Sequence, residues 1–193
     1  VNGFTSGQIS REAFWALAKF KHPTHQISFH TVNALHCLTF EGVSPSMTEK
    51  QKNDILYVCS LIETIARKTK NHRQDVIRHF TKADIKRQFR LAEVKPLLSF
   101  EQVSDELIED LNIPDGDFDT VAECRYTVPS ATSIGMLYQG LVLSTMKDED
   151  AAQAILDGFF VVITDEISDF NSNVYYTNPD YLRCSYLEGK MLA

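Results

Sequence analysis

Apolar side chains that recur at helical spacing are the feature of this sequence that most restricts its fold. The clearest case opens with Thr48 and Gln51, which form a T-x-x-Q capping box of the kind that begins helices. Four apolar residues then follow on one helical face: Ile55, Cys59, Ile62 and Ala66. The pattern predicts a helix of about five turns over residues 49–68.

Similar spacing recurs along most of the chain. Helices are also predicted over residues 10–22, 71–80, 81–89, 99–111, 134–145, 149–170 and 178–189. Residues 28–40 fit either a helix or a strand. With 8 glycines and 6 prolines in 193 residues, the chain lacks the frequent turn signals of an all-β fold. We therefore expect an all-α protein, a helical bundle of seven or eight helices arranged as one bundle or as two helical subdomains.

Proline and glycine indicate a boundary in the middle of the chain. Pro114, Gly116 and Pro129 lie in a stretch rich in acidic and hydroxyl side chains. This composition is typical of a linker between two packed units. The predicted parts are an N-terminal helical bundle at 1–114, an acidic linker at 115–133, and a C-terminal helical unit at 134–193 whose long helix spans about 149–170.

Charged residues are divided unevenly along the sequence. The formal net charge is 19 − 26 = −7, but residues 67–95 carry ten basic and three acidic side chains, and residues 96–193 carry four and eighteen. The basic segment could neutralise the phosphates of a nucleic acid. Its candidate contacts are Arg73, Arg78, Lys82, Lys86, Arg87 and Arg90. The favoured alternative is that these side chains form the solvated faces of short helices, because the acidic remainder of the chain repels nucleic acid.

A group of histidines raises the hypothesis of a metal-binding protein or an enzyme. His22, His25, His30 and His36 are followed by Cys37, but their spacing completes no tetrahedral ligand set. A polar turn is therefore the favoured interpretation of this segment, and no metal or other cofactor is expected. The sequence also contains no nucleophile-elbow or phosphate-loop motif, which disfavours an enzyme without excluding one.

Neither membrane insertion nor disulfide bonding is indicated by the sequence. The longest run of large apolar residues, 159–163, has five members, whereas a membrane span needs roughly 18. The cysteines, Cys37, Cys59, Cys124 and Cys184, form no C-x-x-C pair, and three of them fall on apolar-patterned segments. We expect all four to be reduced core residues, which predicts a cytoplasmic protein, and two disulfides are the alternative interpretation.

The C-terminal stretch 171–186 is the leading candidate for partner binding. Tyrosines alternate there with asparagines, and the candidate contact residues are Tyr175, Tyr176, Tyr181, Tyr186 and Asn173. Tyrosine combines apolar area with a polar tip, which suits a recognition surface. The same property suits the edge of a domain, where a ring packs and its hydroxyl stays hydrated, so packing is the alternative interpretation.

Residues 54–112 also resemble a known family. The stretches ILYVCSLIETIARKTKNHRQDVIRHF and LLSFEQVSDELIEDLNI are similar to small bacterial all-helical domains of unknown function. In that family a helix with an I-E-x-x-A run is followed by a short helix and an acidic helix. Its members are partners encoded beside ADP-ribosyltransferase-like proteins, so the resemblance implies a bacterial toxin–antitoxin or accessory role and no catalytic residue.

Three functional hypotheses follow from these observations. The preferred one is a non-enzymatic protein–protein interaction module, because no convergent catalytic set is visible and the charged blocks favour steering toward a charged partner. The second is a nucleic-acid-binding regulator that uses residues 67–95. The third is a metal-binding protein or enzyme that uses residues 22–36.

Overall fold

The structure of the chain is a computed structural model, and four stretches of it are described. These stretches are residues 47–94, 100–146, 150–159 and 163–192. They belong to one unit of the chain, Glu41–Ala193. The helix predicted at 10–22, the ambiguous segment 28–40 and the histidine-rich segment 22–36 lie outside the described residues.

Helix α2, Glu49–Thr69, is central to this unit. The Thr48 hydroxyl accepts a hydrogen bond from the backbone N–H of Gln51 at 3.2 Å, and the Gln51 side chain accepts one from the N–H of Thr48 at 2.9 Å. This confirms the predicted capping box. The helix ends before Lys70, whose φ of 52° forms a left-handed C-cap. The fully buried positions of α2 include Ile55, Cys59, Ile62, Ile65 and Ala66.

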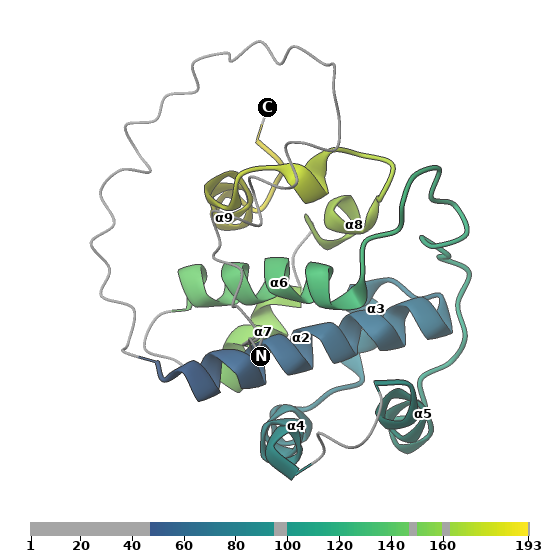
Figure 1. The fold of residues 1–193 in the computed structure, drawn as a ribbon, viewed down its shortest axis with the longest axis vertical. Helices are drawn as coiled ribbons and strands as arrows, with labels where there is room; N and C mark the ends of the chain where they lie inside the picture. Colours follow the sequence, from purple (N-terminus) through teal and green to yellow (C-terminus); the bar gives the residue numbers. More distant parts are fainter. Residues whose placement is uncertain (1–46, 95–99, 147–149, 160–162, 193) are drawn as a thin grey trace, which may run out of the picture. The chain divides into compact units, whose positions relative to one another are not determined.

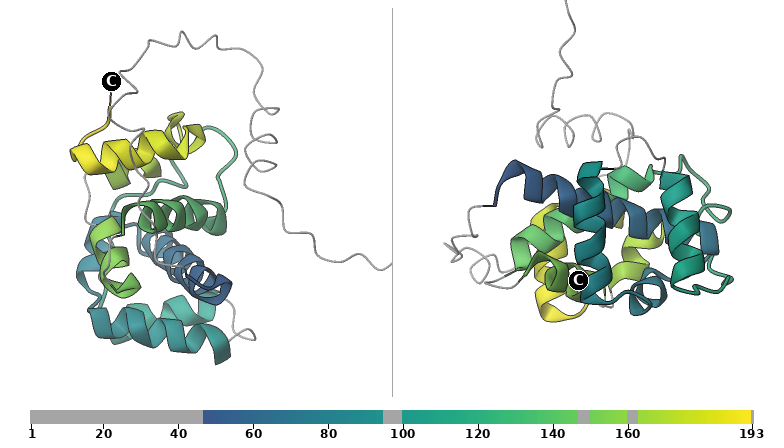
Figure 2. Two further views of the ribbon diagram at one scale, coloured as in Figure 1. Left: turned by 90° about the vertical axis from the view of Figure 1, so that its left-hand side faces the viewer. Right: turned by 90° about the horizontal axis from the view of Figure 1, so that it is seen from below.

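Other helices cover α2 on several sides. Helix α6 runs alongside it, whereas α4 and α5 lie on the side of α2 away from α6 (Figures 1 and 2). The helices that contact α2 are α3 (Arg73–Arg78), α4 (Lys82–Val94), α5 (Phe100–Asp110), α6 (Ala131–Thr145) and α7 (Ala151–Phe159). This arrangement buries apolar side chains around α2 on every side, so that the core follows the axis of this helix.

A further layer lies on the face of α6 that points away from α2 (Figure 2). It contains α8 (Ile163–Ser168), the 3-10 helix η1 (Val174–Tyr176) and α9 (Pro179–Glu188). Helix α9 lies in the predicted range 178–189 and begins at an asparagine cap, since the Asn178 side chain accepts a hydrogen bond from the N–H of Asp180 at 2.9 Å. It ends at Gly189, which has a φ of 66°.

Close contact between α2 and α6 depends on a glycine. A Cβ atom at Gly135 would lie 2.2 Å from the Ser60 hydroxyl oxygen and 2.9 Å from the Ser60 backbone nitrogen. No larger residue fits there without moving the α2 backbone. Gly135 therefore sets the distance between the two helices, a role that offsets its low helix propensity.

The described residues contain eight α-helices, one 3-10 helix and no strand, which confirms the predicted all-α fold. One element differs from the prediction. The strong apolar pattern over 149–170 predicted a single long helix, whereas the structure has α7 and α8 there as separate helices. Helix α7 packs against α6, α4, α3 and α2, whereas α8 packs against η1 and α3. A single spacing pattern cannot distinguish one helix from two that bury the same kind of face against partly different partners.

The stretch predicted as a linker, 115–133, forms backbone hydrogen bonds with the C-terminal end of α2. The N–H of Gly116 donates to the Thr69 carbonyl at 2.7 Å, and the N–H of Phe118 donates to the Lys70 carbonyl at 2.7 Å. A Cβ atom at Gly116 would lie 2.6 Å from that Lys70 carbonyl oxygen, so this close approach requires glycine. Residues 115–133 thus pack as part of the same unit as α2.

No helix in the described stretches combines the length and the apolar character needed to cross a lipid bilayer.

Candidate functional site

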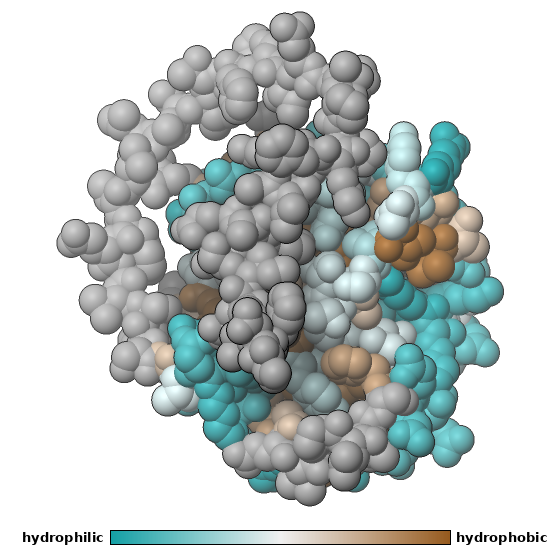
Figure 3. Space-filling model, viewed as in Figure 1, coloured by the Kyte–Doolittle hydropathy of each residue, from teal (hydrophilic) through white to brown (hydrophobic). Residues whose placement is uncertain are grey.

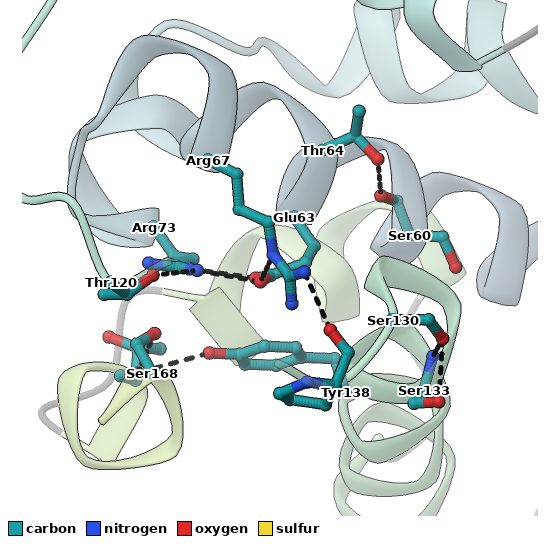
Figure 4. Close-up of polar contacts among 12 residues, drawn as sticks. Ser60, Glu63, Thr64, Arg67, Arg73, Thr120, Ser130, Ser133, Tyr138 and Ser168 are labelled. Carbon is teal, nitrogen blue, oxygen red and sulfur yellow. Dashed lines mark hydrogen bonds and ion pairs between the residues drawn. The ribbon is translucent and has the colours of Figure 1, made fainter. Parts of the chain in front are cut away.

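A cluster of buried ionic side chains lies where α2, α3 and the loop before α6 meet (Figure 4). Glu63 on α2 and Arg73 on α3 both have no exposed side-chain surface. Arg73 Nη2 donates to Glu63 Oε1 at 2.7 Å, and Arg73 Nε donates to Glu63 Oε2 at 2.8 Å. The pair is therefore bidentate, which is the strongest geometry for an arginine and a carboxylate. Arg73 Nη2 also donates to the hydroxyl of Thr120 at 3.2 Å.

Arg67 connects this pair to two other parts of the chain. Its Nε donates to Glu63 Oε1 at 2.7 Å, and its Nη1 donates to the carbonyl oxygen of Pro129 at 2.8 Å (Figure 4). Its guanidinium carbon lies 4.9 Å from the ring centre of Phe170, and that of Arg73 lies 5.9 Å from the same ring. Both cations thus interact with the face of one aromatic ring. Arg67 thereby holds the residues before α6 and the residues after α8 against α2.

Arg73 stays charged although it is buried. Burial alone lowers the pKa of Arg73, but the charge and hydrogen bonds of Glu63 outweigh burial and leave that pKa above its ordinary value. The Glu63 carboxylate accepts hydrogen bonds from two guanidinium groups and has no exposed side-chain surface. A general base must reach a substrate proton, and this carboxylate cannot. The arrangement suits holding helices together and not acid–base catalysis.

Tyr138 of α6 lies below Glu63 and Arg67 in the view of Figure 4. Its ring stacks on Phe159 with centroids 4.0 Å apart, and its hydroxyl donates to the carbonyl oxygen of Thr164 at 3.5 Å. Burial strongly raises the pKa of Tyr138, and the negative charge of Glu63 adds to that effect. The phenol therefore stays neutral and acts as a packed hydrogen-bond donor between α6 and α8.

His72 links α3 to α8 beside the cluster. Its Nδ1 lies 2.9 Å from Asp165 Oδ1, and both side chains are partly exposed. The imidazole ring stacks on Phe118 with centroids 3.9 Å apart and an interplanar angle of 13°. His72, at the start of α3, thus contacts both Asp165 on α8 and Phe118 in the loop before α6.

Two segments next to the ionic cluster are joined directly to each other. One is residues 121–133, before and at the start of α6, and the other is residues 169–176, after α8. The N–H of Arg125 donates to Asn171 Oδ1 at 2.8 Å, and Asn171 Nδ2 donates to the carbonyl oxygen of Glu123 at 3.0 Å. Residues from distant parts of the sequence thus meet at Asn171.

Both segments present large apolar side chains to solvent. Val121, Tyr126 and Tyr176 have exposed fractions of 39%, 62% and 44%. The partly buried ring of Tyr175 meets that of Tyr176 edge to face, with centroids 4.7 Å apart. We call Val121, Tyr126, Tyr175 and Tyr176 the tyrosine surface. Figure 3 shows exposed apolar side chains over the loop between α5 and α6, where part of it lies.

The tyrosines predicted to bind a partner divide into two groups. Tyr176 is exposed on η1, with Tyr175 beside it and Asn173 exposed at the N-cap of η1. Tyr181 and Tyr186 are partly buried on α9, and the Tyr181 hydroxyl donates to the carbonyl oxygen of Leu192. The structure therefore places Tyr181 in a packing role. Sequence reasoning missed Tyr126, which is 62% exposed and follows Arg125, whose N–H bonds to Asn171.

Most of the basic side chains in residues 67–95 form ion pairs with acids of the same chain. The pairs are Arg67 and Arg73 with Glu63, Lys68 with Asp105, Lys70 with Asp119, Arg78 with Asp75, Lys82 and Lys86 with Asp150, and Arg87 with Asp110. Among the predicted nucleic-acid contacts, Arg73 is fully buried, which rules out contact with a phosphate in this fold. Arg90 lies exposed on α4. Acids of residues 96–193 thus pair with five of these cations, and Glu63 and Asp75 pair with the other three.

Cysteines and possible metal ligands can be assessed in the described stretches. No group of three or more His, Cys, Asp or Glu side chains there could hold a metal ion. Cys59 is buried and free, and Cys124 is partly exposed and free, as expected. Cys184 is disulfide-bonded, so the expectation that every cysteine is reduced was wrong for this residue. Cys37 lies outside the described residues.

No protein-family model, curated protein or solved structure matches this chain.

Proposed function

We propose that this chain is a non-enzymatic protein-binding module whose contact surface is the tyrosine surface. The observation that carries the proposal is the exposure of Tyr126 and Tyr176 on two segments that Asn171 joins. Exposed aromatic rings in a fixed position are typical anchors of protein interfaces, because each buries a large area at a low cost in conformational entropy.

The buried ionic cluster supports this proposal by holding the surface in place. Arg67 bonds to Pro129 on one segment and stacks on Phe170 of the other. A surface that is rigid before binding loses less entropy when a partner arrives. The cluster therefore has a consistent role as a support for recognition.

The nucleic-acid alternative has less support, because most of its candidate cations already neutralise acids of the same chain. Phosphate binding would have to compete with these pairs. The toxin–antitoxin or accessory role implied by the resemblance of residues 54–112 is one form of the proposed function, since such proteins act by binding a partner.

Selection from a displayed library of random 12-residue peptides on the full chain tests the proposal. The chain is expected to enrich a consistent set of peptides, and a Tyr126→Ala/Tyr176→Ala variant is expected to lose the enrichment. Met136→Ala is a matched control, because Met136 is 44% exposed on α6 and lies outside the tyrosine surface. The proposal fails if nothing is enriched, or if the tyrosine variant enriches the same peptides equally well.

A further inference from the structure

We propose that the buried ionic cluster binds a small inorganic anion, of the size of chloride, at the guanidinium groups of Arg67 and Arg73. This inference concerns the interior of the protein and does not depend on the tyrosine surface. It follows from the hydrogen bonds, the charge and the burial of the two guanidinium groups.

Each of the two guanidinium groups has one nitrogen atom that is left without an acceptor. Nε and Nη2 of Arg73 donate to Glu63, whereas Nε of Arg67 donates to Glu63 and its Nη1 donates to the carbonyl oxygen of Pro129 (Figure 4). The remaining nitrogens, Arg73 Nη1 and Arg67 Nη2, are buried and form no hydrogen bond with the described residues. A buried donor on a charged group is costly to leave unbonded, so these atoms require an acceptor from outside the chain.

The cluster also contains more positive than negative charge. Arg67 and Arg73 each donate to the same oxygen atom, Glu63 Oε1, at 2.7 Å, so that two cations share one carboxylate. Asp165 acts on Arg73 only at longer range, because its carboxylate bonds to His72 and is 46% exposed. A buried lysine can lose its proton, but arginine keeps its charge in proteins. The excess positive charge therefore favours a counter-ion.

A small anion meets both requirements, whereas a water molecule meets one. Water would accept a hydrogen bond from an unpartnered N–H but would leave the charge uncompensated. An anion at either unpartnered nitrogen would lie close to both cations, because Arg67 and Arg73 share Glu63 Oε1. The Arg73 side chain has no exposed surface and that of Arg67 is 16% exposed. This burial selects a compact ion over a bulky organic anion.

Urea unfolding of the full chain in mixtures of sodium chloride and sodium gluconate tests the proposal. The total salt concentration is held constant, and urea replaces guanidinium chloride because the latter would add the ion. Raising chloride from about 5 to 300 mM should increase the folding equilibrium constant about fourfold, which mass action gives for a dissociation constant of about 100 mM. No dependence on chloride would overturn the proposal.

Arg67→Met is the variant that should lose the response to chloride. It removes one cation and leaves the neutral pair of Glu63 and Arg73, which needs no counter-ion. Arg78→Met, which removes an exposed arginine paired with Asp75, is the matched control and should keep the full response. An equal response to chloride in Arg67→Met and the wild type would overturn the proposal, because chloride would then act elsewhere on the protein.

Bromide locates the ion without a variant. Crystals of the full chain grown in sodium bromide are expected to show an anomalous scattering peak within hydrogen-bonding distance of Arg67 Nη2 or Arg73 Nη1. A water molecule or protein atoms at these two nitrogens, with no anomalous peak, would overturn the proposal even if stability depends on chloride.

Discussion

Glu63 and Arg73 form a doubly hydrogen-bonded ion pair from which solvent is fully excluded, with N–O distances of 2.7 and 2.8 Å. The two residues are ten positions apart in the sequence. They lie on different helices, which residues 70–72 connect. A pair of this kind is a weak net stabiliser when it is intact, but the loss of one partner leaves an uncompensated buried charge.

Replacement of Arg73 by methionine is therefore expected to destabilise the protein by about 3–5 kcal/mol. Arg67 can compensate Glu63 in part, so the lower end of that range is the expected value. Urea unfolding followed by circular dichroism measures the change. Arg78→Met on the same helix is the matched control. It removes an exposed pair with Asp75 and should cost under about 1 kcal/mol. Similar losses in the two variants would show that the buried pair has no special role.

Substitution of Gly135 by alanine tests the contact between α2 and α6. The new Cβ would lie 2.2 Å from the Ser60 hydroxyl oxygen and 2.9 Å from the Ser60 backbone nitrogen. We expect a loss of about 1–3 kcal/mol in unfolding free energy, because overpacking forces the backbone to move. Addition of Ser60→Ala should restore a part of this loss, since it removes the nearest atom but not the backbone contact.

Gly158→Ala on α7 serves as the control for that experiment. Its Cβ would meet the end of the Val142 side chain at 3.1 Å, which a small side-chain movement relieves. Its effect should be clearly smaller than that of Gly135→Ala. Equal effects would indicate a general loss from adding a methyl group to a helix, and not a specific limit on the distance between α2 and α6.

Asp150 predicts a dependence of stability on pH. Its Oδ2 pairs with Lys86 and Lys82, and its Oδ1 accepts a hydrogen bond from the N–H of Ala152 at 2.9 Å. Partial burial raises the pKa of Asp150, but the bonds from Lys86 and Ala152 outweigh burial, so the pKa is lowered overall. A lowered pKa gives stability that is fully present above the ordinary aspartate value of about 3.9 and is lost as pH falls through the lowered pKa.

Comparison of the wild-type chain with Asp150→Asn isolates this contribution, because asparagine also caps helices. The wild type should be more stable at pH 7, and the difference in unfolding free energy should shrink once the pH falls below about 4. Urea titrations from pH 7 to pH 2 measure it. A difference that grows on acidification would contradict the lowered pKa.

Thiol reactivity should distinguish the two free cysteines. Burial raises the pKa of the Cys59 thiol, which has no exposed surface, whereas Cys124 is partly exposed. Because the thiolate is the reactive form, N-ethylmaleimide is expected to modify Cys124 in the folded protein and Cys59 after denaturation. Peptide mass spectrometry identifies the modified residue. Modification of Cys59 before Cys124 in the native protein would contradict the burial of Cys59 on α2.

Much of the fold follows from local signals in the sequence. The capping boxes at Thr48 and Thr81 and the asparagine cap at Asn178 begin α2, α4 and α9 in the structure, because each uses atoms within three residues of one another. The division of residues 149–170 into α7 and α8 depends on which helices each half contacts, and spacing does not contain this information.

The ionic cluster was not predicted, although one part of it left a signal. Glu63 follows Cys59 by four residues and so lies on the apolar face of α2, where a carboxylate needs a buried cation. The identity of that cation could not be read from the sequence. Its basic neighbours instead make Arg73 a candidate for a nucleic-acid contact or for a solvated helix face, and the structure buries it. Tyr126 was missed because the contact that places its segment, from the N–H of Arg125 to Asn171, joins residues that are distant in sequence.

Chemical-shift mapping of the full, ¹⁵N-labelled chain with the most enriched library peptide shows directly whether a partner binds at the tyrosine surface. We expect the shift changes to concentrate at the backbone amides of residues 121–133 and 169–176. Changes centred on α4 and its basic side chains, or spread evenly over the unit, would contradict it.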